Sequence, residues 1–280
     1  MGLNWRPGDN IVAFREEFPS NFYPWKRLET QRCYVEWLSV YDPLEVIDNA
    51  CRGAKLLAIS FVQYLSGFRA DLNALGRICR ARGCFFLVDA IQGLGAFPLD
   101  VEAAQIDALA ADGHKWLLGP EGCGILYVRK DWQDLVFPTE FGWTNVAGYN
   151  DYASRDMTLR QDAGRYECGT LNTIGCFGLR ASLELLLEIG VPRIAPVVQG
   201  LADRLAEGAR AKGYTVLGER TPASSSGICA IFKSGIDNQA IVRTLKGKGI
   251  VAAARQGWVR LSPHFYISPE EIDQVIDALP

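Results

Sequence analysis

The stretch Phe-Phe-Leu-Val-Asp-Ala-Ile-Gln at residues 85–92 carries the clearest signal for the fold. Its four apolar residues are followed directly by Asp89, the pattern of a strand that is buried on both faces and ends at a polar residue. Compact apolar runs of the same kind occur at residues 11–14, 56–60 and 124–128. Because amphipathic stretches separate these runs, the sequence predicts an α/β fold with a mostly parallel sheet.

Helix signals lie between the predicted strands. Asp42 and Pro43 open a helix that runs towards Gly53, since proline favours the first helical position and glycine the position after the last turn. A second helix is expected over residues 71–83. Residues 174–188 form a third, strongly helical run.

The sequence Gly-Val-Pro at residues 190–192 interrupts the helical pattern and marks a predicted domain boundary. Residues 1–190 are expected to form a large domain with a linking helix, and residues 191–280 a smaller α+β domain. The small domain is predicted to contain strands near residues 214–217 and 228–232 and helices at residues 201–211, 238–246 and 269–278.

The composition excludes several kinds of partner. The chain has 280 residues, a formal net charge of −3 and 49% hydrophobic residues, typical of a soluble globular protein. It has no basic footprint for nucleic acid or an anionic membrane surface. No run approaches the roughly 20 apolar residues of a membrane span, and the N-terminus lacks the build of a secretion signal. A cytoplasmic location is therefore expected.

The eight cysteines are scattered and form no C-x-x-C pair, and the chain has only two histidines. These counts argue against a structural zinc site, and no metal is expected. Several cysteines lie in apolar runs, so most are interpreted as small buried hydrophobic residues. Free thiols in this number indicate a reducing compartment.

Lys115 is the strongest candidate for a functional residue. It follows the turn expected at Gly113 and precedes the apolar residues 116–118, a poor setting for a merely solvated charge. Burial would lower the pKa of its amine, as would a protonated His114 beside it. Asp89 lies at the end of a predicted strand, where open α/β sheets place ligand-binding residues. An aspartate in this position is, by itself, more often a turn or cap residue.

The motifs Val-Asp-Ala-x-Gln at residues 88–92 and Asp-Gly-His-Lys-Trp at residues 112–116, followed by residues 119–124, resemble the class V aminotransferase family. That family includes cysteine desulfurases and isopenicillin N epimerase-like enzymes. The similarity extends over nearly the whole chain, including residues 8–12, 17–21 and 167–172. It implies a type I fold of the transferases that depend on pyridoxal 5′-phosphate (PLP), with PLP as the cofactor and an amino acid as the substrate.

The resemblance also implies roles for individual residues. Lys115 matches the lysine that holds PLP as a Schiff base, and Asp89 the partner of the pyridine nitrogen. Gln92 matches the hydrogen-bond donor to the phenolate oxygen, and His114 a ligand of the phosphate.

Two further residues fall at positions that the family uses for the cofactor. Phe18 lies where a histidine or another ring covers the cofactor face, so an aromatic stack is implied there. Thr170 matches a residue that reaches the phosphate in the neighbouring subunit, which makes a homodimer part of the expectation. Core packing for Phe18 and helix capping for Thr170 are the structural alternatives.

Arg260 and Arg255 match the small-domain pattern in which an arginine holds the substrate α-carboxylate by two parallel hydrogen bonds. Arg260 is the preferred candidate and Arg255 a supporting one. Cysteine desulfurases of the family carry a nucleophilic cysteine on a loop between these positions. Here only residues 256–259, Gln-Gly-Trp-Val, intervene. Transamination, epimerisation or lyase chemistry is therefore preferred to desulfurase chemistry.

The chain also departs from the family pattern. It begins at a point that corresponds to the middle of the large domain, so the family's N-terminal arm and first cofactor-binding turn have no counterpart. Asp112 stands where a phosphate-binding serine is common, and residues 63–64, Gln-Tyr, replace a more usual Ser-Asn. The alternative hypothesis is a truncated, catalytically inactive fragment. A NAD-dependent enzyme is set aside because no G-x-G-x-x-G motif follows a strand.

Overall fold

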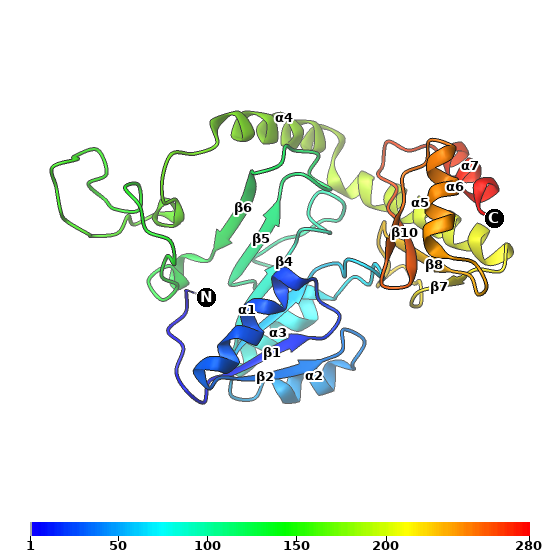
Figure 1. Ribbon diagram of the computed structural model, residues 1–280. Helices are drawn as coiled ribbons and strands as arrows, with labels where there is room; N and C mark the ends of the chain where they lie inside the picture. Colours follow the sequence, from blue (N-terminus) through cyan, green and yellow to red (C-terminus); the bar gives the residue numbers. More distant parts are fainter. Residues whose placement is uncertain (1) are drawn as a thin grey trace.

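The large sheet organises the first half of the chain. The computed structural model describes residues 2–280. Six strands pair in the order β2-β1-β3-β4-β5-β6, and all neighbours are parallel except β6, which runs antiparallel to β5 (Figure 1). In chain order the strands are β1 (Asn10–Phe14), β2 (Tyr34–Leu38), β3 (Ala54–Ser60), β4 (Phe85–Asp89), β5 (Ala108–Asp112) and β6 (Gly124–Val128).

Side chains alternate between the two faces of this sheet, as the pleat of a strand requires. In β1, Val12 and Phe14 join the core that contains the α2 and α3 residues Ile47 and Leu75. Ile11 belongs to the opposite core, with α1 residues and aromatic side chains of several loops. Both faces of the central strands are thus buried, which explains their nearly continuous apolar sequences.

Helices connect the parallel strands. They are α1 (Tyr23–Leu28), α2 (Leu44–Ala50) and α3 (Leu72–Arg82). Both ends of α3 are capped: the Asp71 carboxylate accepts from the Ala74 backbone N–H at 2.9 Å, and Gly83 adopts a left-handed conformation with φ 66°. Short 3₁₀ turns occur at Pro19–Asn21, Glu29–Gln31, Lys130–Trp132 and Ala163–Tyr166.

Two long helices lead from the large sheet to the C-terminal part, α4 (Thr173–Ile189) and α5 (Val191–Ala211), and they meet at Gly190 (Figure 1). Gly190 has φ 89°, a conformation that glycine adopts without strain. The first turns of α5 pack on the large core through Ile194 and Val198, and the later turns pack on a separate core through Leu201 and Leu205. The division of the chain at residue 190 remains a prediction, since α5 contributes to both cores.

The C-terminal part is a four-stranded antiparallel sheet in the order β7-β8-β10-β9, covered by helices. Its elements after α5 are β7 (Thr215–Val216), β8 (Cys229–Phe232), α6 (Asn238–Gly247), β9 (Ala253–Arg255), β10 (Trp258–Leu261) and α7 (Pro269–Ala278). The α/β fold with a smaller α+β part agrees with the prediction. Within residues 2–280, every helix is too short or too polar to cross a lipid bilayer.

The sequence-based assignment missed some elements. Strand β2 lies at the sheet edge, where exposed positions alternate with half-buried ones and only Leu38 is buried, and β5 has the sequence ALAAD, in which alanine favours helix. Helix α5 was predicted to begin near residue 201 but begins at Val191, with Pro192 at its start and Pro196 inside it. Packing against both cores offsets the hydrogen bond that Pro196 removes.

Candidate active site

The carboxyl ends of three adjacent parallel strands meet at one edge of the large sheet. Ser60 at the end of β3 pairs in register with Asp89 at the end of β4, and β5 ends at Asp112. Four of the eight predicted site residues line a cavity of about 1180 Å³ there: Phe18, Asp89, His114 and Lys115. Open α/β sheets bind ligands at this edge.

A tight turn after β5 presents Lys115 to the cavity. The Gly113 N–H donates to the Cys123 carbonyl at 2.8 Å, and a Cβ at Gly113 would lie 2.6 Å from that same oxygen. Only glycine fits so close to the neighbouring backbone. Lys115 itself is half-buried, whereas the next two residues, Trp116 and Leu117, are buried and hold the turn in place.

Hydrogen bonds from two distant segments anchor the residue after Lys115. The Trp116 indole N–H donates to Gln92 Oε1 at 3.0 Å. The His264 ring accepts from the Phe265 N–H at Nδ1, which leaves the proton on Nε2, 3.2 Å from the Trp116 carbonyl oxygen. Gln92 is buried behind the cavity wall and does not line it. Gln92 and His264 therefore fix the turn that carries Lys115.

Burial and neighbouring charges act on the two central ionisable groups. The pKa of Lys115 is lowered, first by desolvation and further by Arg260, while Asp89 opposes the shift. The pKa of Asp89 is raised by desolvation, against a hydrogen bond from the Ile91 N–H at 3.0 Å and the attraction of Lys115. An amine with a lowered pKa is more often neutral and nucleophilic.

Phe18 lies beside the lysine, on the loop that follows β1. The Lys115 ammonium is 5.9 Å from the centre of the Phe18 ring, and this ring contacts Tyr64 edge to face at 5.2 Å. Phe18 is 41% exposed, so it is not a core residue. Its ring is available to cover a flat ligand.

Glu17 is a buried acid beside the site to which sequence reasoning assigned no role. Glu17 is 6% exposed, and its carboxylate accepts hydrogen bonds from the backbone N–H and the hydroxyl of Ser60. Desolvation raises the pKa of Glu17 to about 7, with a further contribution from Asp89. Nothing in the sequence signals its burial, since the hydrogen bonds come from Ser60, which is 43 positions away.

The substitution Glu17→Gln is expected to remove a pH dependence of stability. A carboxyl group whose pKa is raised in the folded state stabilises the fold at pH values below the pKa of the unfolded state. This contribution is lost as the pH rises through about 7. An amide reproduces the hydrogen bonds of the protonated acid. We expect equal free energies of unfolding near pH 4 and an advantage of roughly 3 kcal/mol for the variant at pH 8. Urea denaturation at both pH values measures this, and parallel pH profiles would contradict it.

The remaining predicted cofactor residues lie at the surface. His114 Nδ1 is 3.8 Å from the Asp112 carboxylate, so a protonated His114 would offset the acid that stands where a serine was expected. Thr170 is exposed and lies outside the cavity wall. The residue that caps α4 is Asn172, whose side chain accepts from the Gly175 N–H.

Arg260 and Arg255 lie on the antiparallel strands β10 and β9 of the C-terminal part, outside the cavity wall. Arg260 donates to the Tyr64 carbonyl at 2.7 Å, and its own pKa is lowered, first by desolvation and then by Arg255. Gln256 and Gly257, both with positive φ, form the tight hairpin turn between the two strands. Two turn residues leave no loop that could carry a cysteine.

Comparisons with known proteins agree on the family. The aminotransferase class-V family model matches residues 1–275. The probable cysteine desulfurase of Methanothermobacter thermautotrophicus is 29% identical over an alignment of 301 residues. The alignment covers 99% of this chain and 74% of that relative. The apo structure of the cysteine desulfurase from Thermococcus onnurineus NA1 has a TM-score of 0.91 and 26% identity, covering 98% of this chain and 72% of the other.

A solved structure of a C-DES variant with glycine covalently linked to its PLP cofactor has a TM-score of 0.89 and 22% identity, covering 99% of this chain and 75% of that one. This likeness is one of fold. The type I fold and the family expected from the sequence are confirmed. The chain belongs to the aminotransferase class-V family of PLP-dependent enzymes.

Proposed function

We propose that this chain is a PLP-dependent enzyme that acts on the amino group or the Cα of an amino acid, by transamination, epimerisation or lyase chemistry. The observation that carries the proposal is a single cavity with an amine, a carboxylate, an imidazole and an aromatic ring in its wall. They belong to Lys115, Asp89, His114 and Phe18.

This set of side chains fits the cofactor group by group. The Lys115 amine can bind the aldehyde, and the Asp89 carboxylate can pair with a protonated pyridine nitrogen. His114 offers a donor to the phosphate, and Phe18 offers a ring to the flat face. A cavity of about 1180 Å³ holds more than a cofactor and a small substrate require.

Each residue has a separate role in the proposed reaction. PLP, when bound, supplies an electron sink that stabilises negative charge at the substrate Cα. Asp89 keeps the ring nitrogen protonated and so strengthens that sink. The partly desolvated Lys115 amine would hold the cofactor through its aldehyde and, in the presence of an amino acid, would accept the Cα proton. Gln92 and His264 hold the turn that aims this amine.

Desulfurase chemistry ranks second for this chain, although its relatives include cysteine desulfurases. Persulfide formation needs a thiolate near the substrate sulfur. Among residues 2–280, the cavity wall contains no cysteine, and the hairpin between Arg255 and Arg260 has a two-residue turn. A reaction confined to the cofactor, the substrate and Lys115 needs no such thiol.

The homodimer also belongs to the proposal. Thr170 is exposed outside the cavity, so its hydroxyl is accessible to a second subunit. A cytoplasmic location is proposed on the grounds of composition alone.

Cα-proton exchange tests the proposed function directly. The full chain with PLP is incubated in D₂O with each protein amino acid, and loss of the Cα-proton signal is followed by NMR. We expect exchange with at least one amino acid. The products, a 2-oxo acid, an inverted amino acid or a released side-chain group, identify the reaction. A complete absence of exchange in cofactor-loaded protein would contradict the proposal.

Variants of Arg260 test whether this residue binds the α-carboxylate of the substrate. Replacing a charge-assisted hydrogen bond donor costs about 1.5–3 kcal/mol, so Arg260→Gln should raise the KM for the amino acid roughly 10- to 150-fold. Arg260 also lowers the pKa of Lys115. In the apo protein, the pH midpoint for covalent capture of PLP should therefore move upward in Arg260→Gln and stay in place in Arg260→Lys. Unchanged KM and midpoint would exclude Arg260 from the site.

A further inference from the structure

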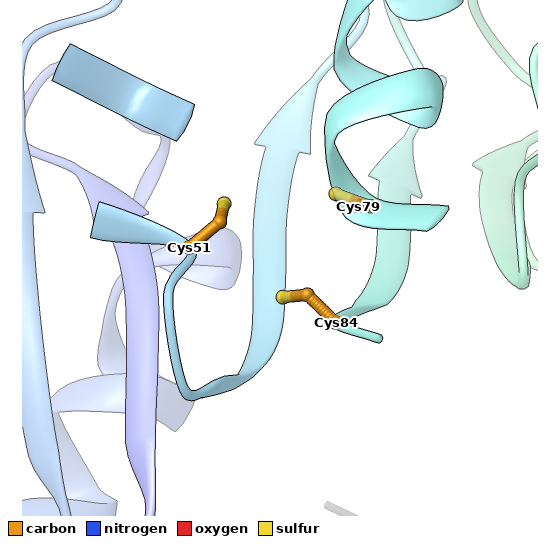
Figure 2. Close-up of side chains that lie close together, drawn as sticks. All are labelled: Cys51, Cys79 and Cys84. Carbon is orange, nitrogen blue, oxygen red and sulfur yellow. The ribbon is translucent and has the colours of Figure 1, made fainter. Parts of the chain in front are cut away.

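Three cysteines that are distant in the sequence converge in the core of the large domain. Cys51 follows the last turn of α2, Cys79 lies in α3, and Cys84 immediately precedes β4 (Figure 2). Their three sulfur atoms all lie within 4.8 Å of one another. In Figure 2 the side chains point into the space between the two helices and the sheet.

This cluster, Cys51, Cys79 and Cys84, differs from the other thiols of the chain. Its members are 0%, 1% and 3% exposed, and in the described part of the chain they are the one group of three or more potential metal ligands within this distance. Cys33 and Cys229 are buried as well, but neither belongs to such a group. Packing as small apolar residues explains an isolated buried thiol. It does not explain why three sulfurs lie within 4.8 Å of one another.

We propose that the cluster binds a thiophilic cation of low coordination number, of which Cu(I) is the representative. Soft thiolate ligands select Cu(I) over hard cations. Structural zinc requires four ligands, and no His, Asp, Glu or fourth Cys joins the cluster within residues 2–280. Each sulfur that binds as a thiolate releases its proton to solvent, and no electron is transferred.

Two members of the cluster lie next to surface turns. Cys51 is followed by exposed Arg52 and Gly53, and Cys84 is preceded by exposed Gly83, so two of the ligands lie directly beneath surface turns. A bound ion would tie α2 and α3 to the start of β4.

The test uses the full chain with Cys123, Cys168 and Cys176, which are not buried, replaced by Ser. Cu(I) is added anaerobically in competition with a chromophoric chelator. We expect one tightly held equivalent, an X-ray absorption spectrum with only sulfur neighbours, and a higher unfolding temperature. Cys79→Ala should weaken binding more than about 100-fold, since even outer-shell changes cost metal sites 10- to 100-fold.

The matched control is Cys229→Ala, which removes a fully buried thiol that has no cysteine cluster around it. It should bind Cu(I) as the parent does. Unchanged affinity in Cys79→Ala, no retention by the parent, or a copper shell with oxygen or nitrogen neighbours would each overturn the proposal. Because the absorption spectrum is recorded on the parent, the test stands even if Cys79→Ala folds poorly.

Discussion

Replacing Lys115 with alanine is expected to abolish Cα-proton exchange, with a loss of at least about 10,000-fold in rate. The substitution removes both the amine that binds the cofactor and the base that accepts the Cα proton. Lys115 is half-buried in a turn that Trp116 and Gly113 hold independently of its side chain. The fold should therefore be retained, and exchange rates measured by NMR report the loss.

Lys115→Arg is the matched control for charge. It keeps a cation near Asp89, but a guanidinium does not lose its proton in this pH range. Exchange should be lost as completely as in Lys115→Ala. Exchange within tenfold of the parent in either variant would show that another residue acts as the base.

The substitution Asp89→Asn should lower the exchange rate by about 1,000-fold, in line with the loss of a preorganised charge at an active site. The amide oxygen can still accept the hydrogen bond from the Ile91 N–H, so the local structure should be kept. What disappears is the negative charge that holds a proton on the pyridine nitrogen. A rate close to that of the parent would exclude this role.

A second prediction for Asp89→Asn concerns the pH midpoint for covalent capture of PLP, which should shift in the opposite direction to that in Arg260→Gln. Because the Asp89 carboxylate raises the pKa of Lys115, its removal should move the pH midpoint for covalent capture of PLP downward. Removal of the Arg260 cation should move it upward. Borohydride trapping at a series of pH values measures both midpoints, and shifts of the same sign would contradict the electrostatic description.

Much of the fold could be predicted because the central strands are buried on both faces. Continuous apolar runs gave β1, β3, β4 and β6 within two residues of their observed bounds. The two strands of the large sheet that were missed, β2 and β5, have weak local signals. An edge position allows polar residues in β2, and the alanines of β5 are accommodated only because neighbouring strands pair with them.

The candidate site was predictable only where its residues belong to short sequence motifs at strand ends. Lys115 and Asp89 follow strands that end at the same sheet edge, so a motif and a rule of topology find both. The contact between His264 and Trp116 joins residues 148 positions apart. The burial of Glu17 likewise depends on Ser60, 43 positions away. Such contacts arise from tertiary packing, which local patterns do not encode.

The three-cysteine cluster illustrates the same limit. Cys79 and Cys84 are five residues apart, but Cys51 comes from a different helix, and no metal-binding motif has this spacing. The sequence therefore favoured separate buried thiols. Their convergence follows from the packing of α2 and α3 on the same face of the sheet.

Borohydride reduction followed by peptide mapping tests the central claim most directly. The full chain is saturated with PLP, the absorbance band of the bound cofactor is recorded, and the reduced protein is digested and analysed by mass spectrometry. The account predicts the band and one modified peptide, which carries the cofactor on Lys115. Absence of the band at saturating PLP, or modification of other lysines that persists in Lys115→Ala, would contradict it.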